Sequence, residues 1–317
     1  MGSICDVRDS VPSLPTLERY ELLERIGRGG VGEVFRARER VGDFVREVCI
    51  KRLFASVPPE QVGALREEAR LLARLRHANI VSLLGVGEEA SGSPFLVLEL
   101  IRGENLRTLC KAREAAGVVP DGEGLVPDRI AVHVACGVLR GLAAVQRAVP
   151  GLVHRDVTPH NVLVSNEGEV KLGDFGIALA VDRARSTPPH TVKGKLGYVS
   201  PEQLRNERLD VRNDVFAVGV MLYELLARRR PWRGEAGYRE LRAIESAQRD
   251  PLHLHRPRID PHLAAVIERL LAHRRHERFI SADDALRALA PFSAGDLGSL
   301  RLAALVAEHA RRCSEAP

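Results

Sequence analysis

A run of closely spaced glycines lies near the start of the chain, between two segments that are predicted to be strands. It reads Gly27-Arg28-Gly29-Gly30-Val31-Gly32-Glu33-Val34, which fits the pattern G-x-G-x-x-G-x-V. Because glycine has no β-carbon, such a backbone can approach a phosphate group closely. The same residues would also suit an ordinary hairpin turn. A dinucleotide-binding turn is disfavoured, because its glycines lead into a helix rather than a strand.

Lysine is rare in this chain: only five of the 47 basic residues are lysine, and Lys51 ends the apolar run Val48-Cys49-Ile50. An edge-strand lysine whose amine reaches water would explain it, but the rarity favours a functional role. Glu68 lies on a predicted helix, one turn before its apolar stripe. This position can direct the carboxylate towards Lys51. Glu67 competes for that role, and a solvated glutamate is the plain alternative.

Two further segments place acidic and amide side chains in loops flanked by β-rich runs. The first is His154-Arg155-Asp156-Val157-Thr158-Pro159-His160-Asn161, with the pattern H-R-D-x-x-x-x-N, and the second is Asp174-Phe175-Gly176. Gly197-Tyr198-Val199-Ser200-Pro201-Glu202 and Asp214-Val215-Phe216-Ala217-Val218-Gly219 follow. The order and spacing of these segments resemble the eukaryotic-type (Hanks-type) protein kinase family. The resemblance extends over about residues 20–290.

The resemblance implies an α+β, bilobal fold, with a small β-rich N-lobe that holds one helix and a larger, mainly α-helical C-lobe. We expect a flexible leader over 1–18 and a kinase domain over 19–290. Within that domain the expected divisions are an N-lobe over 19–98, a hinge over 99–103 and a C-lobe over 104–290. A C-terminal helical extension would occupy 291–317.

Hydrophobic periodicity agrees with this division. Short strands are predicted at 34–37, 45–53, 81–85 and 95–98. Helices are predicted at 59–75, 105–115, 128–148, 214–228, 238–247, 262–272 and 282–289, followed by an amphipathic helix over 300–312. These elements would have to position the residues named above.

The resemblance also implies a role for each of these residues in phosphoryl transfer. Lys51, held by Glu68, would bind the α- and β-phosphates of ATP. Asn161 and Asp174 would bind Mg²⁺, or Mn²⁺ in its place, and Asp156 would orient the substrate hydroxyl and accept its proton. The other implied nucleotide contacts are Gly27, Gly29, Gly30, Gly32, Val34, the gatekeeper Leu98, and the hinge residues Glu99 and Ile101.

Three charged residues have an implied supporting role. Asp214 would hold the backbone of the catalytic loop, which we define as residues 154–161, and Glu202 would pair with Arg278. Surface charge is the alternative for all three, and Asp214 could also cap a helix. Cys49 and Ser200 stand where the family usually has alanine, and both are small enough to be tolerated.

The chain departs from the family pattern at two linked positions. Most Ser/Thr kinases have lysine two positions after the catalytic aspartate, where this chain has Thr158, and threonine where it has Lys195. We hypothesise that the two residues are exchanged, so that Lys195 supplies the ammonium group and Thr158 the hydroxyl group near Asp156. The alternative is that Thr158 weakens catalysis and Lys195 is solvated.

Pro159 favours Ser/Thr over Tyr specificity within this resemblance, because tyrosine kinases have different residues there. Arg155 precedes the catalytic aspartate, where an arginine commonly binds a phosphate on the activation segment. The candidate phosphorylation sites are Ser186, Thr187 and Thr191. The sequence of the catalytic loop and the high arginine content of the chain resemble those of Ser/Thr kinases from GC-rich soil bacteria such as myxobacteria.

Composition excludes several other classes. The 317 residues are 45% hydrophobic and 28% charged, with a net charge of +5, which is typical of a folded protein. Five cysteines without regular spacing argue against a disulfide framework and favour a cytoplasmic location. No apolar run is long enough to span a membrane, and Asp6 weakens an N-terminal acylation signal. The arginine clusters lack the interleaved aromatic residues expected of nucleic-acid binding, and paired histidines such as His253 and His255 lack partners for a metal site.

The sequence therefore predicts a cytoplasmic enzyme that transfers the γ-phosphate of Mg-ATP to Ser or Thr of protein substrates. A pseudokinase that binds nucleotide or a partner without transfer is the rival, and Thr158 is its best support. A kinase of small molecules is a third reading, but such enzymes normally lack the Pro201-Glu202 segment. We expect regulation through a separate sensor or docking partner.

Overall fold

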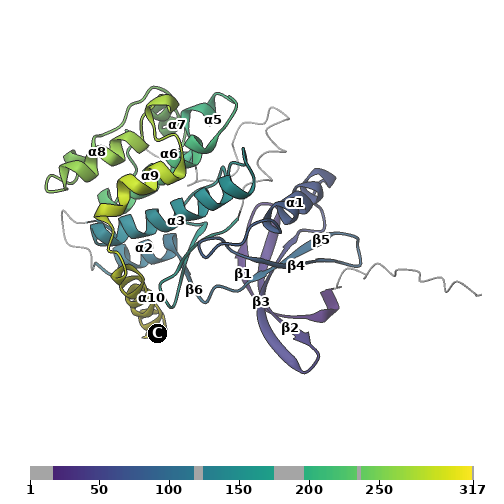
Figure 1. Ribbon diagram of the computed structural model, residues 1–317. Coiled ribbons are helices and arrows are strands. Elements are labelled where there is room, and N and C mark those ends of the chain that lie inside the picture. The colour runs from purple at the N-terminus through teal and green to yellow at the C-terminus, as the bar shows by residue number, and fades with distance from the viewer. Residues whose placement is uncertain (1–16, 118–123, 175–195, 234–236, 316–317) are drawn as a thin grey trace, which may run out of the picture. The chain divides into compact units, whose positions relative to one another are not determined.

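The computed structural model describes residues 17–117, 124–174, 196–233 and 237–315 (Figure 1). The chain divides into two compact units. The first comprises residues 1–69 and 83–100, and the second comprises residues 70–82 and 101–317. Phe175, Gly176, Ser186, Thr187, Thr191, Lys193 and Lys195 lie outside the described residues.

The first unit is an antiparallel sheet of five strands accompanied by a helix. The sheet order is β1-β2-β3-β5-β4, so β3 lies at its centre. The strands are β1 (Tyr20–Arg28), β2 (Gly32–Val41), β3 (Phe44–Leu53), β4 (Leu83–Glu88) and β5 (Pro94–Glu99), and the helix is α1 (Pro59–Leu72). A short 3-10 turn, Leu17–Arg19, precedes β1.

Alternating side chains of the first unit's strands form its core. Ala37 of β2, Val48 and Ile50 of β3, and Phe95 and Val97 of β5 are at most 1% exposed. The ring of Tyr20 meets the ring of Phe95 edge-on, with centroids 5.6 Å apart. These contacts fix the register of β3, which fixes which residues of that strand face the core.

The second unit is mainly helical and contains a small sheet of three strands. The sheet has the order β6-β7-β8, with β6 (Gly103–Asn105), β7 (Val162–Ser165) and β8 (Val170–Leu172). The helices are α2 (Leu106–Ala115), α3 (Asp128–Ala148), α5 (Pro201–Leu204), α6 (Val211–Ala227), α7 (Tyr238–Glu245), α8 (Pro261–Leu270), α9 (Ala282–Leu289) and α10 (Leu297–Glu315). Short 3-10 turns lie at Leu196–Tyr198, Leu252–Leu254, Arg275–Glu277 and Ala290–Phe292.

Helix α6 is the centre of the second unit's core. Residues 213–226 are all buried, and the helix packs against α3, α8 and α9. A helix that is buried all round cannot show the one-sided apolar stripe of a surface helix. Gly219 allows this close packing, because a β-carbon there would lie 2.8 Å from Leu270.

The fold class expected from the sequence is confirmed, and several element boundaries differ from prediction, most clearly those of α1, β4, α6 and α10. Helix α1 ends at Leu72 rather than at 75, because the next two turns close with i→i−3 hydrogen bonds from the amides of Arg74 and Leu75. The strand predicted at 81–85 corresponds to β4. It begins at Leu83 and ends at Glu88, which is three residues later than predicted. Helix α6 starts at Val211, capped by Asp210, so Asp214 is not its N-cap. Helix α10 is longer than predicted at both ends.

Candidate functional site

The glycine-rich segment forms the turn between β1 and β2 in the first unit. The amide of Gly29 donates to the carbonyl of Gly32 across the turn, at 2.9 Å. A β-carbon at Gly32 would overlap the carbonyl oxygen of Arg52 on β3, so only glycine fits this position. Gly27 faces Val34 in the strand pairing. The turn is therefore tight and exposes main chain in the way that binding of a phosphate requires.

Lys51 lies on the central strand β3, where it faces Val34 of β2 and Leu96 of β5. Its Nζ atom donates to both carboxylate oxygens of Glu68 on α1, at 2.8 and 3.0 Å. The Glu68 side chain is 6% exposed and the Lys51 side chain 21%. Glu67, the competing residue, is exposed. The pair fixes a half-buried ammonium group on a rigid strand, which suits it to bind an anion.

Cys49, Leu98 and Glu99 also lie on paired strands of the first unit. Cys49 of β3 faces Leu98 of β5, and Val48 faces Glu99, the last residue of β5. Cys49 and Leu98 are nearly buried. Ile101, the other predicted hinge residue, follows β5 at the start of the second unit's main segment.

The catalytic loop of the second unit is held by Asp214. The Asp214 carboxylate accepts hydrogen bonds from the backbone amides of His154 and Arg155, at 2.7 and 2.8 Å. Asp214 is 1% exposed, and this burial raises the pKa of its carboxyl group, while His154 and the two amides act in the opposite direction. Arg155 has a φ of +71°, a conformation that is strained for a residue with a β-carbon.

His154 joins the catalytic loop to the segment that precedes Asp174. The amide of Asp156 donates to His154 Nδ1 at 3.4 Å, so the protonated Nε2 donates to the carbonyl of Gly173, at 3.1 Å. Burial lowers the pKa of His154, so the imidazole is neutral and this tautomer can persist near neutral pH. His154 therefore acts as a structural link between the two loops.

Asp156 and Asn161 are in direct contact. Asn161 Nδ2 donates to the backbone carbonyl and to Oδ2 of Asp156, at 2.7 and 2.8 Å. Both hydrogens of the amide are used in this way, so its oxygen Oδ1 is the atom suited to a cation. The carbonyl of Asn161 accepts from the amide of Gly173, at 2.9 Å. This bond places Asp174, with a φ of +50°, next to the Asn161 loop.

The donor set fits a hard divalent cation. Mg²⁺ prefers carboxylate and amide oxygens and keeps several water molecules. In the second unit, Asn161 precedes β7 and Asp174 follows β8, so both lie at the open end of one short hairpin. No cluster of three or more His, Cys, Asp or Glu suited to a metal occurs among the described residues. A two-ligand site completed by water and phosphate oxygens is consistent with both observations.

Glu202 and Arg278 form the ion pair that the resemblance implied. Arg278 Nη1 and Nη2 donate to the two carboxylate oxygens of Glu202, at 2.6 and 3.0 Å. The guanidinium group also donates to the carbonyls of Ala272, Arg212 and His273, and it lies over the ring of Phe216. Arg278 is fully buried, so these partners replace the water that the charge has lost.

The sequence did not predict Gln203 as a support of the catalytic loop, and it predicted Ser200 only as a tolerated small residue, without its bond to Asn213. Gln203 Nε2 donates to the carbonyl of Arg155 at 3.3 Å, and Ser200 Oγ donates to Asn213 Oδ1 at 2.6 Å. Ser200 and Gln203 also form a capping box at the start of α5. The spacing S-x-x-Q is a recognisable signal for that cap, but it does not predict the bond to Arg155.

Thr158 is 1% exposed, and its hydroxyl group has no hydrogen-bond partner among the residues that the structure describes. Its backbone carbonyl accepts from the amide of Asn161, at 2.9 Å. A buried hydroxyl without a partner has lost its bonds to water and is destabilising. Lys195 lies outside the described residues, so the hypothesised exchange of Thr158 and Lys195 stays a prediction.

Replacement of Asp214 by asparagine tests whether its charge holds the catalytic loop. Asp214→Asn leaves one acceptor oxygen for two amides, and hydrogen bonds to a charged acceptor contribute about 1.5–3 kcal/mol each. We therefore expect hydrogen exchange at the amides of His154 and Arg155 to accelerate by about tenfold or more. Asp210→Asn is the matched control, because asparagine is an equally good N-cap. Unchanged exchange at both amides in Asp214→Asn would contradict this role.

The chain is similar to known proteins over most of its length. The model of the protein kinase domain matches residues 20–289. Tyrosine-protein kinase MasK of Myxococcus xanthus is 32% identical over 311 residues, which cover 94% of this chain and 47% of MasK. Serine/threonine-protein kinase PknL of Mycobacterium tuberculosis is 38% identical over 231 residues, which cover 72% of this chain and 54% of PknL. The chain thus spans about half the length of these curated relatives.

A solved structure supports the fold independently. The crystal structure of the PknI kinase domain of Mycobacterium tuberculosis is similar with a TM-score of 0.63 and 24% sequence identity, covering 86% of this chain and 95% of that one. In the described part of the chain, each helix is too short or too polar to cross a membrane. The family match and the identity to MasK confirm the resemblance inferred from the sequence. The chain belongs to the protein kinase family, whose members transfer phosphate from ATP to protein substrates with the help of a divalent metal ion.

Proposed function

We propose that this chain is a serine/threonine protein kinase that transfers the γ-phosphate of Mg-ATP to hydroxyl groups of proteins. The observation that supports this proposal most is the hydrogen bond between Asn161 and Asp156, at 2.8 Å, in a loop fixed by Asp214. A fold kept only for binding would have no need of a base and a metal ligand in one polar contact. Catalysis would then rest on positioning and electrostatics rather than on covalent chemistry.

The first unit contributes groups that bind the nucleotide. Lys51, oriented by Glu68, binds the α- and β-phosphates through its ammonium group, and the backbone over 27–32 approaches the phosphates. The adenine lies against Cys49, Val34 and Leu98 of this unit, and the backbone at Glu99 offers hydrogen bonds to its edge. The backbone at Ile101, the other proposed hinge contact, belongs to the second unit. Each of these groups holds the substrate in a defined position and leaves the bond-breaking step to the second unit's residues.

The second unit contributes the groups that act on the transferred phosphate. Asn161 and Asp174 hold Mg²⁺ or Mn²⁺, which supplies charge neutralisation when bound. Asp156 accepts the proton of the substrate hydroxyl as the oxygen attacks phosphorus. Asn161 orients the Asp156 carboxylate through its amide, so one side chain serves both the metal and the base.

Serine and threonine are the proposed acceptors. PknL is a serine/threonine kinase, and Pro159 has the identity expected for that specificity. Tyrosine is the second candidate, because MasK, which is similar along 94% of this chain, is a tyrosine kinase. The observation that favours a pseudokinase is Thr158, because it stands where most Ser/Thr kinases have a lysine.

The experiment that tests the proposal is transfer of labelled γ-phosphate from ATP, with Mg²⁺ or Mn²⁺, to the protein itself and to a generic basic protein. We expect label on Ser or Thr, and a loss of about 100-fold or more in Asp156→Asn, because that variant cannot accept the proton. Asp260→Asn, at the exposed N-cap of α8, is the matched control and should keep full activity. Label on tyrosine would favour the second candidate, and no transfer by a protein that binds ATP would favour the pseudokinase.

The exchange of Thr158 and Lys195 is a separate proposal about the same reaction. If the Lys195 ammonium group stabilises the transferred phosphate, Lys195→Ala should lower kcat by about 100-fold, as removal of one such group typically does. Lys193→Ala, two positions away, should change kcat by less than about twofold, as expected of a solvated charge. Equal, small losses in both variants would show that the residues have not been exchanged.

We further propose that the activation segment is autophosphorylated at Thr187 or Thr191. Arg155, whose pKa is lowered by burial, is next to the base and would gain a charge-assisted partner in the phosphate. Intact-mass and peptide analysis after incubation with Mg-ATP should find one phosphate at one of these threonines and none in Asp156→Asn. Activity without modification of either residue would count against this proposal.

A further inference from the structure

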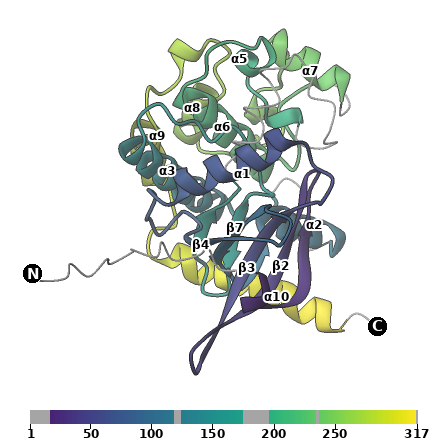
Figure 2. The same ribbon diagram turned by 90° about the vertical axis from the view of Figure 1, so that its right-hand side faces the viewer.

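Helix α10 lies beyond the region that matches the family model, which ends at residue 289. It packs against α2, α3 and β7 of its own unit, and Figure 2 shows it in yellow beside the strand β7. Leu302 and Val306 on its inner face are at most 3% exposed and belong to the same apolar core as Val162, Val164 and Val170 of the β7–β8 hairpin. The helix is therefore built into the second unit's core.

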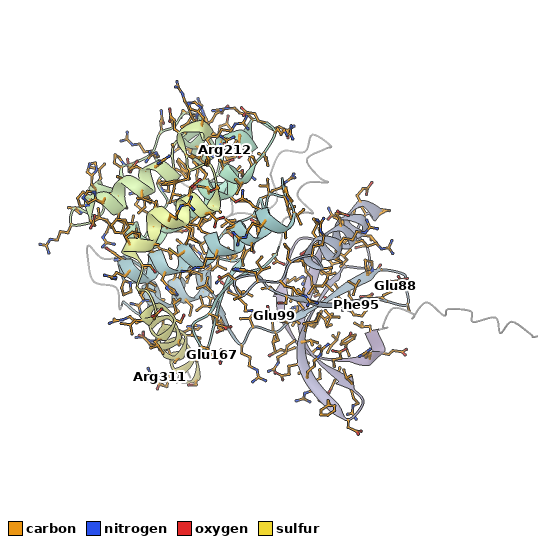
Figure 3. The ribbon with its side chains drawn as sticks, in the orientation of Figure 1. Glu88, Phe95, Glu99, Glu167, Arg212 and Arg311 are labelled. Carbon is orange, nitrogen blue, oxygen red and sulfur yellow. The ribbon has the colours of Figure 1, made fainter. Side chains whose placement is uncertain are left out.

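The turn of the β7–β8 hairpin presses directly on the backbone of α10. Gly168 in this turn has a φ of +81°, and a β-carbon there would overlap the carbonyl of Ser299 in the first turn of α10. The turn itself is rigid, because the amides of Glu167 and Glu169 donate to Ser165 Oγ, at 3.2 and 3.1 Å. Figure 3 labels Glu167 in this turn and Arg311 on α10.

A second set of contacts fixes α10 to α3 and α2. Gly298 lies so close to α3 that a β-carbon would overlap the His133 ring. Arg113 of α2 donates to Glu308 of α10, at 3.4 Å. Before the helix, Arg129 Nη2 donates to the carbonyl of Ser293 at 2.8 Å, and the amide of Ala294 donates to the carbonyl of Arg129 at 3.1 Å. The helix is thus fixed to α2 and α3 and also touches the hairpin turn.

The β7–β8 hairpin connects the two proposed metal ligands. Asn161 directly precedes β7, and Gly173 and Asp174 directly follow β8. The bond from the Gly173 amide to the Asn161 carbonyl closes this end of the hairpin. A tilt of the hairpin about its paired strands would move both ligands together, because two-stranded ribbons this short move as one body.

We propose that α10 is a positioning element that sets the orientation of the β7–β8 hairpin and thereby the geometry of Asn161 and Asp174. Gly168 and Gly298 are the positioning residues, because each allows a backbone approach that any side chain would prevent. The inference rests on the proposed function of those two ligands. It adds a segment outside the matched domain to the parts that the metal site needs.

The test compares two glycines with nearly the same backbone conformation. Gly168→Ala adds a methyl group against Ser299, whereas Gly151→Ala, at a φ of +85°, adds one in open space. Both variants carry the same backbone strain, so only the first displaces the hairpin from α10. The measurement is binding of a fluorescent ADP analogue, titrated with Mg²⁺, together with the melting temperature of each protein.

Mg²⁺ is expected to tighten binding of the ADP analogue. In Gly168→Ala we expect the Mg²⁺ concentration that gives half of this effect to rise by about fivefold or more, because small displacements of the metal-binding side chains weaken a site that depends on their geometry. The affinity for the ADP analogue in the absence of Mg²⁺ should stay within about twofold of the wild-type value, since the substitution leaves Lys51 and the first unit unchanged. Gly151→Ala should match the wild type in both quantities. Equal Mg²⁺ dependence in the two variants would overturn the inference.

A second pair of variants tests the contact of α10 with α3. Gly298→Leu should displace α10 from His133 and raise the Mg²⁺ requirement, whereas Ala304→Leu, at an exposed position of α10, should not. A wild-type protein that binds the analogue without any response to Mg²⁺ would instead contradict the proposed function. A wild type that responds, with both pairs unaffected, would contradict the positioning role alone.

Discussion

The carboxylate of Asp214 accepts hydrogen bonds from two consecutive backbone amides of the catalytic loop, and the local geometry of that loop depends on it. Arg155 has a left-handed φ, which costs about 1–3 kcal/mol. Two hydrogen bonds to a charged acceptor contribute about 1.5–3 kcal/mol each, so they outweigh the strain. Without them the loop would relax towards an ordinary turn, and Asp156 would lose its fixed relation to Asn161. A buried aspartate on the central helix α6 thus helps to fix the position of Asp156, the proposed base.

The segment 200–203 adds a second support to the same loop. Ser200 bonds to Asn213, the neighbour of Asp214, while Gln203 bonds to the carbonyl of Arg155. Glu202 in the same segment is held by the buried Arg278, whose removal would leave an unpaired buried charge. Removal of one partner from such a buried pair is strongly destabilising, because the remaining charge is left without compensation. Loop, helix and segment therefore form one polar network within the apolar core of the second unit.

Much of this could be predicted from the sequence, and the misses have identifiable causes. The spacing of Asp156, Asn161 and Asp174 is local, so motif comparison located them, and helical periodicity favoured Glu68 over Glu67. The start of α6 was misplaced because Asp210 and Asp214 both precede apolar residues. Only burial distinguishes Asp210, which caps the helix, from Asp214, which is buried and bonds to the catalytic loop. The bond from Gln203 to Arg155 spans 48 positions of the sequence. The contacts of Gly168 and Gly298 also join residues that are far apart in the sequence, so no local pattern indicates them. The predicted exchange of Thr158 with Lys195 stays a prediction.

A buried carboxylate holds the catalytic loop in the geometry that the proposed transfer step requires. The most direct test is the single-turnover rate of phosphate transfer at saturating Mg-ATP and substrate, for the wild type and for Asp214→Asn. We expect the variant to lose about tenfold or more in this rate while its KM for ATP changes by less than about threefold, because the proposed nucleotide contacts are largely those of Lys51 and the glycine-rich turn. An unchanged rate, or a change confined to KM, would contradict it.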